Sequence, residues 1–106
     1  MGFYAWTQDV PIDARTYAEI TARMGNTPMA GLVVHLAMER EDGSIHYLDV
    51  WQTKQEHDQA FETVVHPAVH PVLAEHGIRP AGEPPRTPIT VLDVRFADGT
   101  SCRPDA

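Results

Sequence analysis

His35 and Asp49 are the two residues of this chain whose types and spacing most directly suggest chemistry. They lie in two strand-like segments that flank Glu41-Asp42-Gly43, a turn sequence in which the Gly can take a positive φ. If the segments pair, a carboxylate beside the imidazole fixes the tautomer of the ring and raises its basicity. Such a pair predicts a general base that deprotonates a phenol or enol, or moves a proton in a cyclisation. The alternative is a hydrogen-bonded pair that only stabilises the sheet.

The length of the hairpin loop decides whether these two residues meet. A two-residue Asp42-Gly43 turn places His35 opposite Val50, whereas a three-residue loop places His35 opposite Asp49. Only the three-residue loop places these aliphatic residues on one face: Leu32, Val34, Leu36, Met38, Leu48 and Val50. His46 is the one polar residue of that face and lies at its outer end. The opposite face then holds Val33, His35, Ala37, Glu39, Ile45, Tyr47, Asp49 and Trp51. Because a sheet needs one coherent apolar face to bury, we predict the three-residue loop.

Aromatic and aliphatic residues near this pair are candidates for binding a ligand. Tyr47 and Trp51 share the face of His35, where their rings can stack on a planar molecule. Three apolar residues from the hairpin and the following helix complete the predicted substrate-binding set: Val33, Phe61 and Val65. Tyr and Trp are also enriched where subunits pack, so dimer packing is an alternative role that does not exclude the first.

A run of histidines and prolines, His66-Pro67-Ala68-Val69-His70-Pro71, is the most unusual local feature, and His76 follows it. Histidines four residues apart on a helix share a face and can bind a metal, or one of them can hold haem iron. Under the haem alternative His70 is the first ligand candidate and His66 the second. The competing interpretation is a kinked helix end with solvated imidazoles, because proline between the histidines disturbs the helix.

Composition limits the class of protein and its partners. The chain has 106 residues, of which 42% are hydrophobic and 22% charged, as is typical of one soluble globular domain. Its formal net charge of −7 disfavours nucleic acid and anionic membranes as partners. No apolar run is long enough to span a bilayer, the N-terminus lacks a secretion signal, and Cys102 is the only cysteine. These features predict a cytoplasmic protein.

The predicted elements follow the order strand, helix, strand, strand, helix, strand. The first strand is expected at residues 3–8, and Asp13 and Gly25 bound the first helix. A capping box at Thr53-x-x-Glu56 begins the second helix, which the two prolines should kink near His66. Residues 79–88 contain four prolines and predict a surface linker before a last strand at 89–96.

This order predicts an α+β, ferredoxin-like domain over residues 1–96 and a flexible tail over residues 97–106. The domain has a four-stranded antiparallel sheet with both helices on one face. The face that carries Trp51 and Tyr47, with some of Phe3, Trp6, Ile89 and Val91 from the neighbouring strands, is expected to lack helices. Such an apolar face predicts that two sheets pack face to face in a homodimer.

The third predicted strand, which ends in Leu48-Asp49-Val50-Trp51 and runs into Thr53-x-x-Glu56, resembles the dimeric α+β barrel superfamily. The nearest likeness is to antibiotic-biosynthesis-monooxygenase-like domains, and it covers residues 3–96. The resemblance implies a homodimer with a small-molecule pocket in each subunit, between the sheet and the helices. Members include cofactor-free oxygenases, cyclases, isomerases and haem-binding proteins.

The leading hypothesis is therefore a small-molecule enzyme of this monooxygenase-like group that acts on a hydrophobic, aromatic or polyketide-like substrate. His35 is the predicted base, Asp49 its orienting partner, and no cofactor is needed. Two alternatives stay open: a haem-binding dimeric barrel, and a ligand-binding or dimerising protein without catalysis.

Overall fold

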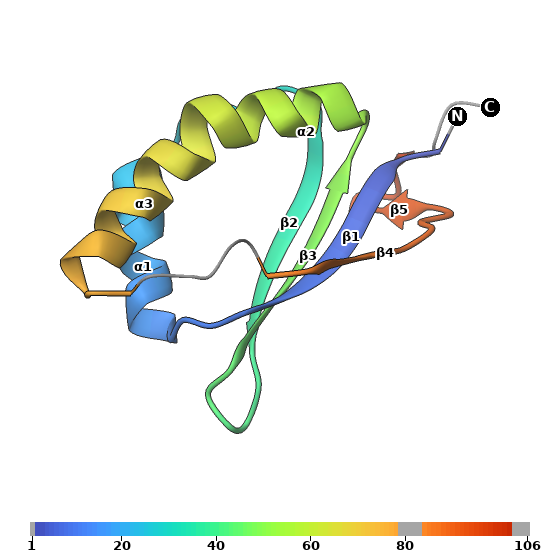
Figure 1. Cartoon of the computed structure of the whole chain (residues 1–106). Coiled ribbons are helices and arrows are strands. Elements are labelled where there is room, and N and C mark those ends of the chain that lie inside the picture. The colour runs from blue at the N-terminus through green and yellow to red at the C-terminus, as the bar shows by residue number, and fades with distance from the viewer. Residues whose placement is uncertain (1, 79–83, 103–106) are drawn as a thin grey trace.

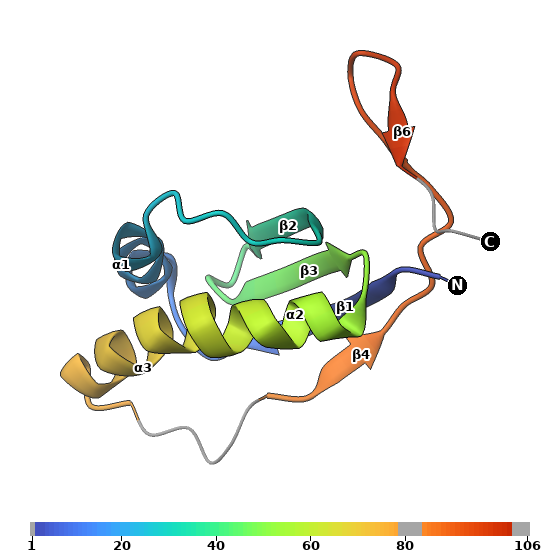
Figure 2. The same ribbon diagram turned by 90° about the horizontal axis from the view of Figure 1, so that it is seen from above.

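The computed structural model describes residues 2–78 and 84–102. Its sheet is antiparallel, with four strands in the order β2-β3-β1-β4: β1 is Tyr4–Val10, β2 is Leu32–Glu39, β3 is Ile45–Trp51 and β4 is Arg86–Pro88. The helices lie together on one face of this sheet (Figures 1 and 2). The predicted α+β class and four-stranded antiparallel sheet are confirmed, with the strand order of a ferredoxin-like fold.

Helix α1 (Ala14–Met24) begins and ends where its capping residues predict. The Asp13 carboxylate accepts a hydrogen bond of 2.8 Å from the backbone N–H of Thr16, which satisfies one of the helix's free donors. Gly25 ends the helix at a φ of 60°, and its N–H is donated to the Thr21 carbonyl. Tyr17 and Ile20 consequently point from α1 towards the sheet, where both line an internal cavity.

A single long helical segment arches across the sheet (Figure 1), in three parts. These parts are helix α2 (Lys54–Ala60), a π-helical turn η1 (Phe61–Val65) and helix α3 (His66–Glu75). The predicted capping box is formed, since Thr53 Oγ1 accepts from the Glu56 N–H at 3.1 Å. The predicted irregularity near His66 is also present, because the π turn meets the proline that follows, which has no N–H to donate. No helix in the described part of the chain is long and apolar enough to cross a membrane.

The β2–β3 hairpin has the predicted three-residue loop. His35 pairs with Asp49, and Arg40 and Ser44 close the loop through a backbone hydrogen bond of 2.9 Å. Gly43 takes the positive φ, 86°, that the turn sequence indicated. One irregularity was not predicted: the register shifts between Leu32 and Val34, so Leu32 pairs with Trp51 and Val33 is the extra residue of a bulge.

The expectation about which face the helices cover is wrong. The helices cover the face of His35, Asp49 and Trp51, and the aliphatic face of Leu36 and Met38 has no helix on it. Leu36 is 47% exposed and Met38 is 39% exposed, whereas Trp51 is 1% exposed. The helices cover the face with the aromatic residues because an aromatic side chain buries more apolar surface than an aliphatic one.

The last predicted strand is also displaced. The structure places β4 at Arg86–Pro88, inside the segment predicted as a linker, and adds a bond from the Ile89 N–H to the Ala5 carbonyl. A proline is tolerated there because β4 is an edge strand. Residues 79–83 of that linker lie outside the described residues.

A small hairpin follows β4 and stands apart from the main sheet (Figure 2). It pairs β5 (Val94–Arg95) with β6 (Ser101–Cys102), and Asp98 accepts from the Thr100 N–H at 2.9 Å in the loop between them. This hairpin occupies part of the tail that was expected to be flexible. Residues 103–106 lie outside the described residues.

Candidate functional site

His35 and Asp49 face each other across β2 and β3, as the predicted register requires. The Asp49 Oδ1 atom lies 2.5 Å from the Nδ1 atom of His35. The Asp49 side chain is 3% exposed and the His35 side chain is 31% exposed, so the carboxylate is buried and the imidazole only partly so. A short contact of this kind is typical of a hydrogen bond to a charged group.

Two further side chains extend this pair into a chain of four. The Trp51 Nε1–H donates to Asp49 Oδ2 at 3.0 Å, and the Tyr17 hydroxyl lies 2.9 Å from His35 Nε2. A carboxylate can only accept, so its contact with His35 places the ring proton on Nδ1. The Nε2 lone pair then faces Tyr17, which donates its hydroxyl proton to it. In these three hydrogen bonds Trp51 and His35 both donate to Asp49, and Tyr17 donates to His35.

Two neighbouring cavities lie between the sheet and the helices, and this chain of side chains borders the smaller. The larger cavity has a volume of about 270 Å³ and the smaller about 80 Å³. All four of these hydrogen-bonded side chains line the smaller cavity. Six residues line both cavities and so mark their boundary: Gln8, Ile20, Tyr47, Phe61, Val65 and Val69.

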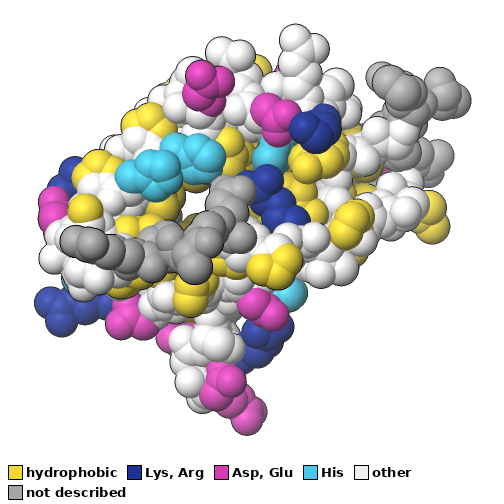
Figure 3. Space-filling model, in the orientation of Figure 1, with side chains coloured by type: hydrophobic (Ala, Val, Ile, Leu, Met, Phe, Trp, Pro, Cys, Tyr) yellow, Lys and Arg dark blue, Asp and Glu magenta, His cyan; other side chains and the backbone are white. Residues whose placement is uncertain are grey.

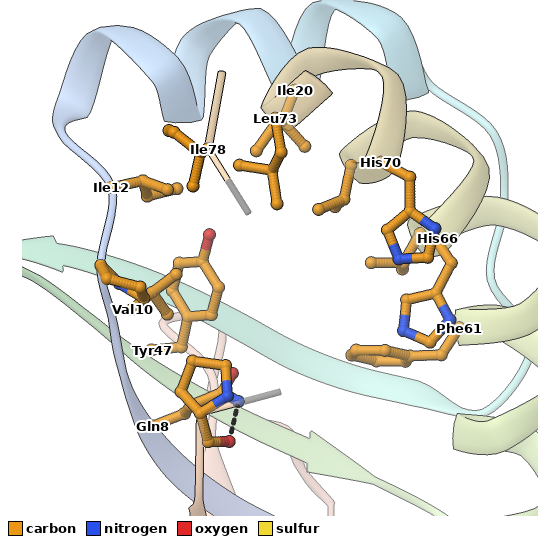
Figure 4. A pocket seen from close by; sticks show the side chains of 14 residues that line it. Gln8, Val10, Ile12, Ile20, Tyr47, Phe61, His66, His70, Leu73 and Ile78 are labelled. Carbon is orange, nitrogen blue, oxygen red and sulfur yellow. Dashed lines mark hydrogen bonds between the residues drawn. The ribbon is translucent and has the colours of Figure 1, made fainter. Parts of the chain in front are cut away.

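The larger cavity is lined mostly by apolar side chains, and its polar lining residues are Gln8, Tyr47, His66 and His70 (Figure 4). The Tyr47 hydroxyl points into it, towards Leu73 and Ile78, while the Gln8 amide donates to the Pro84 carbonyl at 2.8 Å. No Asp or Glu is among the described residues that line this cavity. Such a space favours a hydrophobic ligand with few polar contacts.

The two tyrosines near His35 are held in their neutral form. Burial raises the pKa of the Tyr47 hydroxyl far above its usual value, and the nearby Tyr17 and Asp49 raise it further. Burial also raises the pKa of Tyr17, with a second contribution from the Asp49 charge. Both hydroxyls therefore remain available as hydrogen-bond donors at neutral pH.

An aromatic cluster around His57 supports the other end of the smaller cavity. His57 is 1% exposed, and its Nε2 accepts from the Trp6 Nε1–H at 3.1 Å. Its ring stacks on Phe61 with the centroids 4.2 Å apart, and Trp51 contacts it edge-on at 5.4 Å. Burial lowers the pKa of His57, although its hydrogen bond to Asp58 partly offsets this. This neutral histidine serves as a packing element that holds Trp51 and Phe61 in place.

The structure brings most of the predicted site residues together. His35, Asp49 and Trp51 line the smaller cavity, and Tyr47, Phe61 and Val65 line both. Val33 is the exception, because the bulge removes it from the wall of either cavity. Leu32 lines the smaller cavity in its place, since the bulge moves its side chain to the face of Trp51.

The three histidines of the second helical segment have different surroundings. His66 and His70 line the larger cavity with their rings nearly parallel, 11° apart in angle and 5.1 Å between centroids. His76 lies elsewhere, and its Nε2 is 2.6 Å from a Glu19 carboxylate oxygen. Among residues 2–78 and 84–102, no group of three or more His, Cys, Asp or Glu side chains is arranged to hold a metal ion.

Tyr17, Gln8 and Trp6 are the site residues that the sequence did not single out. Tyr17 lies on the apolar stripe of α1 and was interpreted as packing against the sheet, and Trp6 was one of four candidates for the helix-free face. Strand pairing explains why Trp6 and Gln8 belong to the site, since Trp6 lies opposite Asp49 and Gln8 opposite Tyr47. The available signal was the alternation of β1, because its inward positions must continue the face that the hairpin defines.

Comparison of the chain with protein-family models, with curated proteins and with solved structures found no match. The resemblance to the dimeric α+β barrel superfamily therefore stays a prediction, and the functional argument depends on the geometry of the site.

Proposed function

We propose that this chain binds a small hydrophobic or aromatic molecule between its sheet and helices and removes a proton from it with His35. The observation that carries the proposal is the network of hydrogen bonds from Trp51 through Asp49 to His35, beside two neighbouring, mostly apolar cavities. This combination suits the monooxygenase-like group, in which proton removal from a phenol or enol begins a cofactor-free reaction.

Each member of the site has a distinct role in this proposal. Asp49 keeps the ring proton on Nδ1, so that the lone pair of Nε2 is the basic position. The substrate's O–H or acidic C–H bond breaks, its proton passes to Nε2, and the electron pair stays on the substrate as a phenolate or enolate. Tyr17 occupies Nε2 in the structure, so the substrate either displaces its hydroxyl or passes the proton through it.

In this proposal the substrate reaches the base from the larger cavity. Tyr47 and Phe61 line both cavities, and the Tyr47 ring lies edge-on to His35 with the centroids 5.1 Å apart. A planar molecule held in the larger cavity would therefore rest against Tyr47, with its acidic group in the smaller cavity. Both aromatic rings offer faces or edges for stacking.

A test of the proposal uses β-tetralone, an aromatic ketone with acidic C–H groups, as a model substrate. Its deuterium exchange in D₂O, followed by NMR, should be accelerated by the wild-type protein. His35→Gln should reduce that acceleration about a hundredfold or more, the usual contribution of a positioned general base. His46→Gln is the matched control, because His46 lies on the helix-free face and contacts Asp9.

Equal acceleration by wild type and His35→Gln would overturn the role of His35. If β-tetralone bound without any acceleration, the chain would be a ligand-binding protein without catalysis, the third of the hypotheses drawn from the sequence.

Haem binding is a second candidate, favoured by the presence of His66 and His70 in the wall of the larger cavity. However, a cavity of about 270 Å³ is small for a tetrapyrrole, so the residues present fit a smaller ligand better. Titration with haem decides between haem and a smaller ligand: a Soret band that His70→Ala abolishes would support haem binding.

The proposal includes a homodimer formed through the helix-free face of the sheet. Leu36 and Met38 are exposed there, and an exposed apolar sheet face is a usual subunit interface. Leu36→Asp should shift the chain from dimer to monomer in light scattering. Gln55→Asp, at an exposed position of α2, should leave the dimer intact. A wild-type chain that is monomeric at high concentration would refute this part.

A further inference from the structure

The Tyr47 hydroxyl reaches into the larger cavity from the sheet. Figure 4 shows it pointing towards Leu73 and Ile78, whose side chains are apolar. It makes no hydrogen bond with any residue in the part of the chain that the structure describes. The ring itself is held by two neighbours, since its centroid lies 5.6 Å from that of Tyr17 and 5.1 Å from that of His35. A hydroxyl fixed in an apolar space favours a ligand that supplies its hydrogen-bond partner.

The protonation state of Tyr47 decides which kind of partner that is. Burial raises the pKa of the hydroxyl far above its usual value, so the group is neutral at any pH near 7. A neutral phenol has one proton to donate. The hydroxyl therefore serves as a hydrogen-bond donor, and the ligand must offer an acceptor at this point.

Tyr47 and the proposed base are diagonal neighbours on the helix-covered face of the sheet. Ala37 pairs with Tyr47 and His35 pairs with Asp49, so Tyr47 and His35 are offset by two residues across β2 and β3. Diagonal neighbours of this kind are within reach of aromatic side chains. One small molecule can consequently contact the Tyr47 hydroxyl with one atom and present a neighbouring atom to His35.

The space around the hydroxyl suits an otherwise apolar ligand. The cavity has a volume of about 270 Å³, and aliphatic side chains of β1, α1 and α3 contribute to its lining. Figure 3 shows a hollow in this face of the molecule, bordered by hydrophobic and histidine side chains. An apolar body with a single acceptor oxygen matches both the lining and the hydroxyl.

We propose that the ligand of the larger cavity is an apolar cyclic ketone whose carbonyl oxygen accepts a hydrogen bond from the Tyr47 hydroxyl. This inference rests on the proposed function and names the functional group of its substrate. When a C–H bond beside the carbonyl breaks, its proton passes to Nε2 of His35 and its electron pair forms a C–C double bond. The C–O π pair moves onto the oxygen, and Tyr47 donates to the resulting enolate. A donor already in place where charge develops stabilises the transition state.

The test compares β-tetralone with tetralin, the hydrocarbon of nearly the same shape, in NMR titrations of the protein. Tyr47→Phe should raise the Kd of β-tetralone about fivefold, the usual contribution of one hydrogen bond, and leave the Kd of tetralin unchanged. Because both ligands are measured in both proteins, the different hydration of ketone and hydrocarbon cancels. Tyr4→Phe is the matched control, since Tyr4 is not among the described residues that line either cavity, and it should change neither Kd.

Stability without ligand gives a second measurement. Tyr17→Phe removes a hydroxyl that lies 2.9 Å from His35 Nε2, so it should lower the midpoint of chemical denaturation. Tyr47→Phe should leave that midpoint unchanged or raise it, because no hydrogen bond to a described residue is lost. A midpoint lowered as far by Tyr47→Phe as by Tyr17→Phe would show that the protein already binds the Tyr47 hydroxyl, and would overturn the inference.

The binding outcomes distinguish ketone recognition from the ligand site itself. If Tyr47→Phe weakened both ligands equally, or neither, recognition of the carbonyl would be overturned and the cavity would remain a ligand site. If neither ligand bound to the wild-type protein, the ligand site and the proposed function would both be overturned. The fivefold effect should persist in a His35→Gln background, because His35 acts on the proton and Tyr47 on the oxygen. Loss of the effect there would refute this division of roles.

Discussion

Replacing Asp49 with asparagine should reverse the tautomer of His35 while largely preserving the fold. In the native chain Asp49 accepts from Trp51 at 3.0 Å and contacts Nδ1 of His35 at 2.5 Å. An asparagine in the same place has one acceptor and one donor group. If its oxygen accepts from Trp51, its NH₂ must donate to Nδ1, which forces the ring proton onto Nε2. The Nε2–H must then donate to the Tyr17 hydroxyl, and the lone pair on Nε2 disappears.

The cost to stability follows from the hydrogen bonds that change. Two bonds to a charged group become two neutral bonds, and the difference is about 1 kcal/mol for each bond, so about 2 kcal/mol in total. Asp49→Leu removes both acceptors and leaves Trp51 Nε1 buried without a partner, at about 1–3 kcal/mol per donor. His35 is 31% exposed and can turn to water, so Trp51 should account for most of that larger loss.

The tautomer is measured directly by long-range ¹H–¹⁵N NMR of the imidazole ring. We expect a protonated Nδ1 in the wild-type protein and a protonated Nε2 in Asp49→Asn. In chemical denaturation the wild-type protein should be the most stable, Asp49→Asn less stable, and Asp49→Leu the least stable. Asp58→Asn is the matched control, because Asp58 contacts His57 Nδ1 at 2.8 Å and should leave the His35 signals unchanged. A wild-type His35 with its proton on Nε2, or one tautomer in both proteins, would refute the reasoning about the base.

Two further predictions concern stability. Burial holds the pKa of His57 below 6.5, so the unfolded chain binds a proton before the folded one does as pH falls. The free energy of unfolding should therefore be highest above about pH 6.5 and should decline as the pH falls below it. The decline should be less steep in His57→Gln, whereas the control His70→Gln, at an exposed position, should keep the wild-type slope. Gly31 and Gly43 have φ values of 84° and 86°, but a Cβ at Gly31 would lie 2.6 Å from the Cβ of Glu56, and one at Gly43 would have no neighbour within 4 Å. Gly31→Ala should thus cost about 1 kcal/mol or more beyond Gly43→Ala in thermal or chemical unfolding, and equal losses would contradict this steric argument.

The hairpin register is the part of the site that residue order could predict best. Side chains of a strand alternate with a period of two, so a loop of the wrong length would have mixed charged and apolar residues on both faces. That argument placed His35 opposite Asp49, and the structure confirms it. It did not anticipate the bulge near Val33, because a bulge changes the count of residues on one strand without changing which residues are apolar.

The assignment of the two faces failed for a different reason. Alternation tells which residues share a face, but both faces of this sheet carry enough apolar surface to be buried. The choice depended on the area that Trp6, Tyr47 and Trp51 bury against the helices, which is a sum over contacts between distant elements. For the same reason Tyr17, on another element, could not be connected to His35 from its own sequence surroundings.

Local rules thus determined the pieces of this protein: the caps at Asp13 and Thr53, the three-residue hairpin loop, and the opposition of His35 and Asp49. These features depend on interactions within a few residues or on strand periodicity, which the order of residues states directly. Only the tertiary structure decided that the helices cover this pair, that Tyr17 completes it, and that Arg86 and His66 approach the same ring from different elements. Such relations arise when segments far apart in the chain pack together, and the energies that select one packing over another are summed over the whole core.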